Sequence, residues 1–373
     1  MANIFINGIN SKVGGGKSIL NSFLENISGN NNIYYLLAPD ESYKCYNSIN
    51  INVITISPFF TNGYVYPIIN KYILPYFFKK YIIEVIINFS DIPTLNKKSI
   101  KQLLYFDWAY AVYPESIVWE RMTKREYIYR KIKLFYFKKY FHNIDHVIVQ
   151  TEVIKERLKS IYNFLNITTI PNAVSLNNYK NEKTKKYKLP FDKWKLLYLS
   201  YYYTHKNLEI LIPLAIEIKK RKLDFVIITT IESKQHKYAK AFINNIKRYD
   251  LDSVIINVGP VEQIDIATIY NSCNALLMPS LLESFSGTYI EAMFHKLPIL
   301  TSNLDFAKIV CGNCAAYFDP LSIESILKTI MQVYNNEKIK AEMIMEGERI
   351  VNNIPKWSQV NLILDNIIQN MKS

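Results

Sequence analysis

The stretch LLMPSLLESFSGTYIEAM, residues 276–293, joins a strand-like run to a helix-like run through a polar loop. A short apolar run that ends at Pro279 predicts a buried strand, and the apolar spacing after Gly287 predicts a helix. Glu283 lies in the loop, and Glu291 lies about one turn into the helix. Two carboxylates therefore flank one helix N-terminus, where backbone N–H groups bind anions and carboxylates accept hydrogen bonds from sugar hydroxyls. The N–H groups expected to bind an anion belong to Phe285, Ser286, Gly287 and Thr288.

Strand-like and helix-like segments alternate along the half of the chain that contains this stretch. Short apolar runs are followed by longer segments with helical apolar spacing, such as 208–222 and 237–249. This alternation predicts a doubly wound parallel sheet, in which ligands bind outside the carboxyl ends of the strands. The strand-like runs are 195–200, 224–231, 254–260, 275–280 and 298–302.

The first half of the chain shows the same alternation. An amphipathic segment, residues 151–162, follows the last of its apolar runs. A chain of 373 residues also exceeds what one hydrophobic core usually organises. We therefore expect two α/β domains. The strand-like runs of this half are 3–8, 32–38, 51–57, 102–106 and 146–150.

A polar segment with proline at each end, residues 171–190, separates the two halves and is predicted to be the interdomain linker. Residues 1–170 then form a first Rossmann-like domain on the acceptor side, and residues 191–354 form a second. Residues 355–373 are expected to form a C-terminal helix that can return to the first domain.

A glycine run, Gly14, Gly15 and Gly16, precedes a Lys-Ser pair near the N-terminus. The phosphate loop of nucleotide triphosphatases requires another glycine where Ser11 stands, so this class of enzyme is excluded. Residues without side chains still let the backbone approach a ligand at the N-terminus of the following helix. The alternative, a flexible turn that binds nothing, stays open at this point.

The net charge of +13 and the pI near 9.2 indicate an anionic partner. Residues 124–143 interleave basic with aromatic and aliphatic side chains, and residues 66–89 are rich in Phe, Tyr and Lys. Such composition is typical of helices that lie on a membrane surface, although an ordinary helix with solvated lysines is an equal alternative. Charges and Pro75 interrupt residues 66–89 too early for a membrane span. No nucleic-acid-binding motif accompanies the basic residues, so we expect no nucleic acid partner.

The chain contains four cysteines, too few and too scattered for a disulfide framework. Cys311 and Cys314 have metal-ligand spacing, but no second pair and no histidine cluster accompany them. No secretion signal precedes the first strand-like run. We therefore expect no metal and no other cofactor, and a cytoplasmic location.

Residues 279–293 closely fit the signature P-S-x-x-E-x-F/G-x(5)-E-A, with Ser286 where glycine is most common. On this basis the chain resembles the retaining GT-B glycosyltransferases of the group 1, or family 4, class. The segment YLSYYYTHKNLEIL, residues 198–211, is similar to the nucleotide-sugar segment of that family. Three further segments are similar to other parts of these enzymes: 147–158, 170–174 and 301–320.

The resemblance implies an α/β fold of GT-B architecture, with two Rossmann-like doubly wound domains facing a central cleft. It also implies a nucleotide-diphosphate sugar as the donor. In such enzymes the first glutamate of the signature contacts the transferred sugar and the second binds the ribose, and these are Glu283 and Glu291 here. A lysine, Lys206 in this chain, neutralises the diphosphate. Tyr201 stands where most members carry an arginine that shares the diphosphate with this lysine.

The implied reaction is attack by an acceptor hydroxyl on the anomeric carbon, with retention of configuration, as the nucleotide diphosphate leaves. Stabilisation of the leaving group by preorganised charges makes a metal unnecessary, so metal independence is expected. Gly15 and Gly16 are expected to approach the donor or the acceptor from the first domain.

Many members of the family use a histidine of the first domain near the reacting sugar. In this chain no histidine directly follows the run 102–106. Asp107 and Tyr110 occupy that place and are candidates for lining the acceptor side. The implied acceptor is a saccharide or a lipid-linked saccharide, used in the assembly of surface polysaccharide or glycoconjugates. Because the usual arginine is missing, a non-catalytic GT-B partner subunit of a related transferase stays open as the alternative.

Overall fold

The chain divides into two compact units, each with its own sheet. The computed structural model describes residues 2–12, 14–27, 32–57, 59–60, 65–96, 99–173 and 187–372. Unit 1 comprises Met1–Glu115, Met122–Ala173 and Pro355–Ser373, and unit 2 comprises Ser116–Arg121 and Val174–Ile354. Residues 174–186, which make up most of the predicted linker, lie outside the described part of the chain.

Unit 1 is built on a seven-stranded parallel sheet with the order β3-β2-β1-β4-β5-β6-β7. Its strands are β1 (Asn3–Asn7), β2 (Ile33–Leu37), β3 (Ile51–Ile54), β4 (Val85–Asn88), β5 (Lys101–Tyr105), β6 (His146–Val149) and β7 (Ile167–Thr169). The chain continues from β1 to β2 on one side, and β4 pairs with β1 on the other. The switch point, where ligands bind in doubly wound sheets, therefore lies between β1 and β4.

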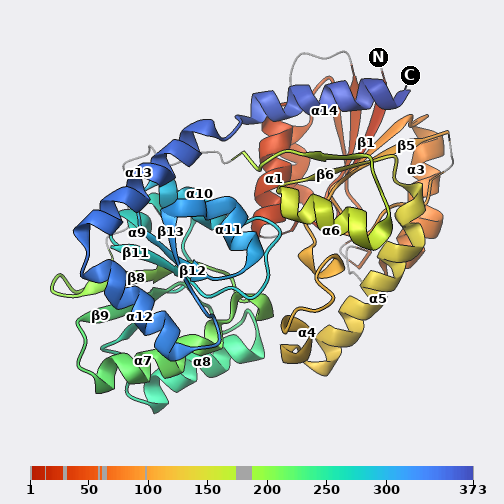
Figure 1. Cartoon of the computed structure of the whole chain (residues 1–373). Coiled ribbons are helices and arrows are strands. Elements are labelled where there is room, and N and C mark those ends of the chain that lie inside the picture. The colour runs from red at the N-terminus through yellow and green to blue at the C-terminus, as the bar shows by residue number, and fades with distance from the viewer. Residues whose placement is uncertain are drawn as a thin grey trace. The chain divides into compact units, whose positions relative to one another are not determined.

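The helices of unit 1 include one from the far end of the sequence. They are α1 (Gly14–Glu25), α2 (Tyr66–Ile68), α3 (Leu74–Lys80), α5 (Lys124–Tyr140), α6 (Glu152–Tyr162) and α14 (Trp357–Lys372). Helix α14 lies against α1 and β5 (Figure 1). Its side chains at helical spacing, Trp357, Val360, Leu364 and Ile368, are buried in the same apolar cluster as Phe23 of α1.

Unit 2 has a six-stranded parallel sheet with the order β10-β9-β8-β11-β12-β13. Its strands are β8 (Trp194–Tyr198), β9 (Phe225–Thr229), β10 (Ile255–Asn257), β11 (Ala275–Met278), β12 (Ile299–Ser302) and β13 (Ala315–Phe318). Its helices are α4 (Val118–Arg121), α7 (Leu211–Lys220), α8 (Lys237–Arg248), α9 (Ile266–Asn271), α10 (Gly287–Phe294), α11 (Asp305–Cys311), α12 (Ile323–Tyr334) and α13 (Glu337–Asn353). The switch point of this sheet lies between β8 and β11.

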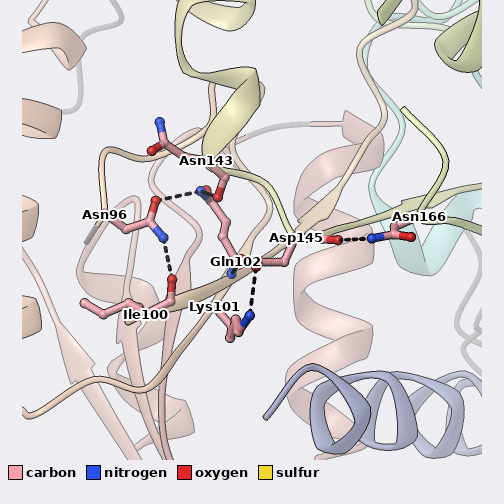
Figure 2. A network of polar contacts seen from close by, with 7 residues as sticks. All are labelled: Asn96, Ile100, Lys101, Gln102, Asn143, Asp145 and Asn166. Atoms are coloured by element: carbon pink, nitrogen blue, oxygen red, sulfur yellow. Dashed lines mark hydrogen bonds and ion pairs between the residues drawn. The ribbon is translucent and has the colours of Figure 1, made fainter. Parts of the chain in front are cut away.

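A buried glutamine fixes the connection between β4 and β5. Nε2 of Gln102, at the start of β5, donates to the carbonyl of Asn143 at 3.0 Å and to Oδ1 of Asn96 at 3.4 Å (Figure 2). The backbone N–H of the same residue donates to Oδ2 of Asp145 at 2.8 Å, just before β6. Because Oε1 of Gln102 also accepts from the backbone N–H of Thr94 at 2.8 Å, one side chain contacts the segment after β4 at both Thr94 and Asn96.

The structure contains three strands that the alternation of the sequence did not reveal: β4, β7 and β13. Strand β4 lies at the end of the apolar stretch 66–89, which also contains α2 and α3, so no boundary in the sequence separates it from these helices. The other two strands have three and four residues. In the described part of the chain, no helix is both long enough and apolar enough to cross a bilayer.

Candidate active site

Two loops meet at the switch point of unit 2, one after β8 and one after β11. The backbone N–H of Leu281 donates to the carbonyl of His205 at 2.7 Å and ties these loops together. Beside this hydrogen bond, Nζ of Lys206 lies 2.6 Å from Oε1 of Glu283. The two side chains are only 13% and 9% exposed. The structure thus brings together the two residues to which the resemblance assigns contacts with the phosphate and with the sugar.

The contact between Lys206 and Glu283 leaves binding capacity on both groups. Two largely buried charges are kept side by side because either one alone would be costly to bury. An ammonium group has three N–H donors and a carboxylate has two oxygens with about four acceptor positions. The pair can therefore bind an anion through the lysine and a hydroxyl through the glutamate.

A short 3-10 turn, Thr204–Lys206, presents the lysine. Asn207 ends this turn in the left-handed backbone conformation, with φ of 56°, which asparagine adopts more readily than most residues. Its buried Nδ2 donates to the carbonyl of Pro320 at 2.9 Å. The hydroxyl of Tyr198, the last residue of β8, donates to the carbonyl of Lys206 at 3.2 Å. Contacts from two directions therefore hold the turn in place.

Helix α10 begins in the same loop as Glu283. Ser286 is its N-cap residue, is 4% exposed and makes no capping hydrogen bond through its side chain. A Cβ atom added at Gly287 would meet nothing within 4 Å, so space is open beside the first turn. Phe285 packs against the apolar cluster under the sheet, and Thr288 is half-buried in the first turn. This arrangement lets an anion approach the helix N-terminus.

Glu291 is held by a tyrosine that the sequence did not single out. The hydroxyl of Tyr270, on α9, donates to Oε2 of Glu291 at 2.9 Å. The ring of Tyr270 is fully buried and stacks on His295, with centroids 5.0 Å apart and an interplanar angle of 7°. His295 shares a hydrogen bond with Oδ1 of Asn271 at 2.9 Å. No local pattern in the sequence indicates the role of Tyr270, because Tyr270 lies 21 residues before Glu291.

Tyr201 lies on the loop after β8 and is 43% exposed. Its ring centre is 5.4 Å from that of Tyr203, and Tyr203 stacks on His205 at 5.3 Å. A row of aromatic rings therefore leads to the turn that carries Lys206.

In unit 1 the glycine run starts α1 after β1. Gly14 has a φ of 63°, in the left-handed region that favours glycine. A Cβ atom at Gly15 would meet nothing within 4 Å, whereas one at Gly16 would lie 3.8 Å from Oδ2 of Asp107. Two of the predicted residues, Gly16 and Asp107, are thus neighbours close to the switch point of this sheet.

Asp107 belongs to a cluster of charged groups at the carboxyl ends of β4 and β5. Burial, and next the negative charge of Asp91, raise the pKa of Asp107 to about 8. Lys133 of α5 forms an ion pair with Asp91, and its Nζ lies 4.4 Å from the ring centre of Trp108. Burial lowers the pKa of Lys133. At neutral pH the raised pKa favours the protonated carboxyl of Asp107, which can donate a hydrogen bond.

Sequence reasoning missed Asp91 and Lys133. Asp91 follows β4, the strand hidden in a continuous apolar run, and Lys133 lies far from it in sequence. The other predicted acceptor-side residue, Tyr110, is 5% exposed, and the guanidinium of Arg130 lies 3.9 Å from its ring centre. Arg130 thus covers one face of this ring.

Cys311 and Cys314 are both buried and free. Burial raises the pKa of the Cys311 thiol. Across the described ranges, no group of three or more His, Cys, Asp or Glu side chains is placed to hold a metal ion.

Comparisons with known proteins agree on the kind of fold. Residues 179–350 match the family model described as glycosyl transferases group 1. No curated protein sequence matches the chain. Sucrose-phosphate synthase from Thermosynechococcus elongatus matches with a TM-score of 0.76 and 14% identity, over 100% of this chain and 99% of its own.

Two further solved structures match over nearly their whole lengths. Anabaena HepE, in complex with UDP and glucose, matches with a TM-score of 0.68 and 14% identity, over 99% of this chain and 100% of its own. WaaG, a glycosyltransferase involved in lipopolysaccharide biosynthesis, matches with a TM-score of 0.69 and 12% identity, over 95% of this chain and 96% of its own. The predicted α/β fold of GT-B architecture is confirmed.

Proposed function

We propose that the chain, whose residues 179–350 belong to the glycosyl transferases group 1 family, is a retaining glycosyltransferase that moves a sugar from a nucleotide-diphosphate sugar to an acceptor hydroxyl. The observation that carries the proposal is the 2.6 Å contact between Lys206 and Glu283 in the loop that starts α10. A cation, a carboxylate and a helix N-terminus are together suited to phosphates and to sugar hydroxyls.

In the proposed complex the diphosphate lies between Lys206 and the first turn of α10. The ribose hydroxyls donate hydrogen bonds to Glu291, and a hydroxyl of the transferred sugar donates to Glu283. As the bond from the anomeric carbon to the diphosphate breaks, negative charge grows on the leaving group, and Lys206 and the helix N-terminus stabilise that charge. The acceptor hydroxyl transfers its proton to an oxygen of the departing diphosphate as its own oxygen bonds to the anomeric carbon on the face that the leaving group vacates, so configuration is retained.

The protein groups named here supply the charge stabilisation themselves, so we propose that transfer needs no metal and no other cofactor. A panel of UDP-, GDP- and ADP-sugars tests donor binding, because a ligand that prefers the folded state raises the melting temperature. One of these nucleotide sugars should raise the melting temperature of the protein. Release of its nucleotide diphosphate during transfer should be as fast in excess EDTA as without EDTA. Stabilisation by none of the three classes would contradict the proposal.

The acceptor side is proposed to lie in unit 1, at Asp107 and the glycine run. The protonated carboxyl of Asp107 can donate to an acceptor oxygen, and Asp91 can accept from an acceptor hydroxyl. The complex of HepE with UDP and glucose and the involvement of WaaG in lipopolysaccharide biosynthesis support a saccharide or lipid-linked saccharide as acceptor. We therefore place the activity in surface polysaccharide or glycoconjugate assembly.

Two helical faces of unit 1 are proposed to bind an anionic membrane at its cytoplasmic face. Leu74 and Phe78 of α3 pack in one apolar cluster with Tyr140 of α5, so the two helices are neighbours. Each helical stretch carries a row of large apolar side chains that remain exposed. These are Ile68, Tyr72 and Tyr76 on the stretch from α2 to α3, and Ile128, Ile132 and Phe135 on α5. We call these six residues the aromatic face.

Exposed lysines flank the aromatic face, and each adds roughly 1 kcal/mol of attraction near an anionic surface. They are Lys71, Lys79, Lys80, Lys131, Lys138 and Lys139. Lys133 is not one of them, because it is 11% exposed and paired with Asp91. The stretch 66–89 contributes only its helical part, because β4 is buried.

Sedimentation with liposomes tests this surface. The variant with Lys131, Lys138 and Lys139 changed to Glu should bind phosphatidylserine liposomes much less than wild type, and salt should partly reverse wild-type binding. A variant with Lys240 and Lys247 of α8 changed to Glu is the matched control, because it carries a similar charge change on unit 2. Equal binding by all three proteins would refute the proposed surface.

A non-catalytic partner subunit is the second candidate, because Tyr201 leaves the donor loop without the expected arginine. The contact between Lys206 and Glu283 favours an enzyme. A protein that binds the nucleotide sugar but never releases its nucleotide diphosphate with any acceptor would favour the partner subunit.

A further inference from the structure

An arginine from a distant part of the sequence contacts the turn that carries Lys206. Nη1 of Arg121 donates to Oδ1 of Asn207 at 2.8 Å, across 86 positions of sequence. Residues 116–121 belong to unit 2, although the segments on both sides of them belong to unit 1. Val118 is fully buried and Trp119 is 8% exposed, so apolar packing fixes α4 and thereby the position of Arg121.

Within the described part of the chain, Arg121 forms no ion pair. Its side chain is exposed, and its guanidinium contacts a neutral amide oxygen there and no carboxylate. Three other arginines form ion pairs with glutamates at 2.6 to 2.7 Å: Arg157, Arg221 and Arg349. A guanidinium has five N–H donors, so one hydrogen bond to Asn207 leaves most of them for a ligand.

The donor loop has too little positive charge to neutralise a nucleotide diphosphate without another cation. Lys206 is already neutralised by Glu283 at 2.6 Å, whereas a nucleotide diphosphate carries more than one negative charge. Tyr201, on the same loop, contributes no charge. Arg121 is bonded to the residue that follows Lys206, and a guanidinium can bind two phosphate oxygens at once.

We propose that Arg121 supplies the second cation of the diphosphate site and enters it from α4. This inference rests on the proposed function and names a further residue of the same site. Asn207 then has two tasks, since its Nδ2 fixes the turn to Pro320 and its Oδ1 orients the guanidinium.

Binding of UDP, GDP and ADP, with the matching nucleosides, tests the assignment by calorimetry. Arg121→Ala should weaken binding of whichever diphosphate binds wild type best by about tenfold or more, the range of a charge-assisted hydrogen bond. Binding of the matching nucleoside should stay unchanged, and the dependence of diphosphate binding on salt should become shallower. Arg121→Gln, which keeps an N–H donor and removes the charge, should show the same loss.

Two controls separate ligand contact from positioning. Asn207→Gly keeps a residue that adopts the left-handed backbone but removes both the partner of Arg121 and the hydrogen bond to Pro320, so its effect is an upper limit for positioning, and it should lose less diphosphate affinity than Arg121→Ala. Arg248→Ala, on α8 of the same unit, should bind like wild type. Wild-type affinity in both Arg121 variants, an equal loss for the nucleoside, or an equal loss in Asn207→Gly would overturn the inference. Wild-type protein that binds none of the three diphosphates would contradict the proposed function itself.

Discussion

The ammonium group of Lys206 and the carboxylate of Glu283 lie 2.6 Å apart, so the cation assigned to the diphosphate is neutralised by the carboxylate assigned to the sugar. A phosphate must compete with this carboxylate for the lysine. Glu283→Gln removes the negative charge and keeps the shape, so it should tighten binding of the nucleotide diphosphate severalfold. Turnover of the nucleotide sugar should fall, because the contact to the transferred sugar is weakened.

Calorimetry with the nucleotide diphosphate and a nucleotide-release assay separate these two effects. Lys206→Ala should instead raise the activation free energy by about 2 kcal/mol or more, the scale of one preorganised electrostatic contact. Glu209→Gln is the matched control, because Glu209 accepts from Tyr202 at 2.7 Å nearby on the same stretch. If Glu283→Gln weakened diphosphate binding as much as Lys206→Ala weakens it, phosphate and Glu283 would not compete for Lys206.

Tyr270 should act on the nucleotide through Glu291. Tyr270→Phe removes the hydroxyl that donates to Oε2 of Glu291, which should cost about 1 kcal/mol of binding free energy, or roughly fivefold in affinity. Glu291→Ala should weaken binding further. In the double variant the loss should equal that of Glu291→Ala alone, because the hydroxyl of Tyr270 is expected to act on the nucleotide through Glu291.

The exposed Tyr249 provides a control for Tyr270, and Tyr249→Phe should leave nucleotide affinity unchanged. A loss from Tyr270→Phe that persists in full beside Glu291→Ala would show that Tyr270 acts by another route.

Asp107 should make the stability of the protein depend on pH. Burial raises its pKa from 3.8 to about 8 in the folded protein, so the folded state binds this proton more tightly than the unfolded chain. The resulting stabilisation is complete below pH 3.8 and is lost as the pH rises through about 8. In Asp107→Asn this dependence should disappear.

Urea unfolding of both proteins across this range measures the effect. The free energy of unfolding of wild type, relative to Asp107→Asn, should fall with rising pH by at most about 1.4 kcal/mol per pH unit. A difference that stays constant between about pH 5 and about pH 8 would show that Asp107 titrates near its ordinary pKa.

Helix α14 should stabilise unit 1 through its buried side. Leu364 is 1% exposed, whereas Leu362 on the same helix is 64% exposed. Leu364→Ala should lower the free energy of unfolding by about 2 to 5 kcal/mol, and Leu362→Ala by much less. Equal effects of the two changes in urea unfolding would mean that α14 does not pack on unit 1 in solution.

The doubly wound architecture could be predicted because strands and helices alternate visibly in both halves of the chain. The meeting of Lys206 and Glu283 follows from the same pattern, since both residues come after strands that flank a switch point. Strand β4 could not be recognised, because it lies at the end of the apolar stretch 66–89, which also contains α2 and α3. Without that strand, Asp91 had no predicted place at the edge of the sheet.

Contacts between distant residues set the remaining limit on sequence reasoning. Lys133 was expected on the surface, where lysines usually lie, and its burial depends on Asp91 and Trp108. Tyr270 and Arg121 reach the site through contacts with residues 21 and 86 positions away. No spacing in the sequence encodes such pairs, because they depend on how separate elements pack.

The anomeric configuration of the product tests the central claim most directly. Wild-type protein is incubated with a saccharide acceptor and the nucleotide sugar that raises its melting temperature most. The coupling constant of the anomeric proton in the new glycosidic bond is then measured by NMR. The account predicts a product with the configuration of the donor, formed by wild type and lost in Lys206→Ala. A product with inverted configuration would contradict it.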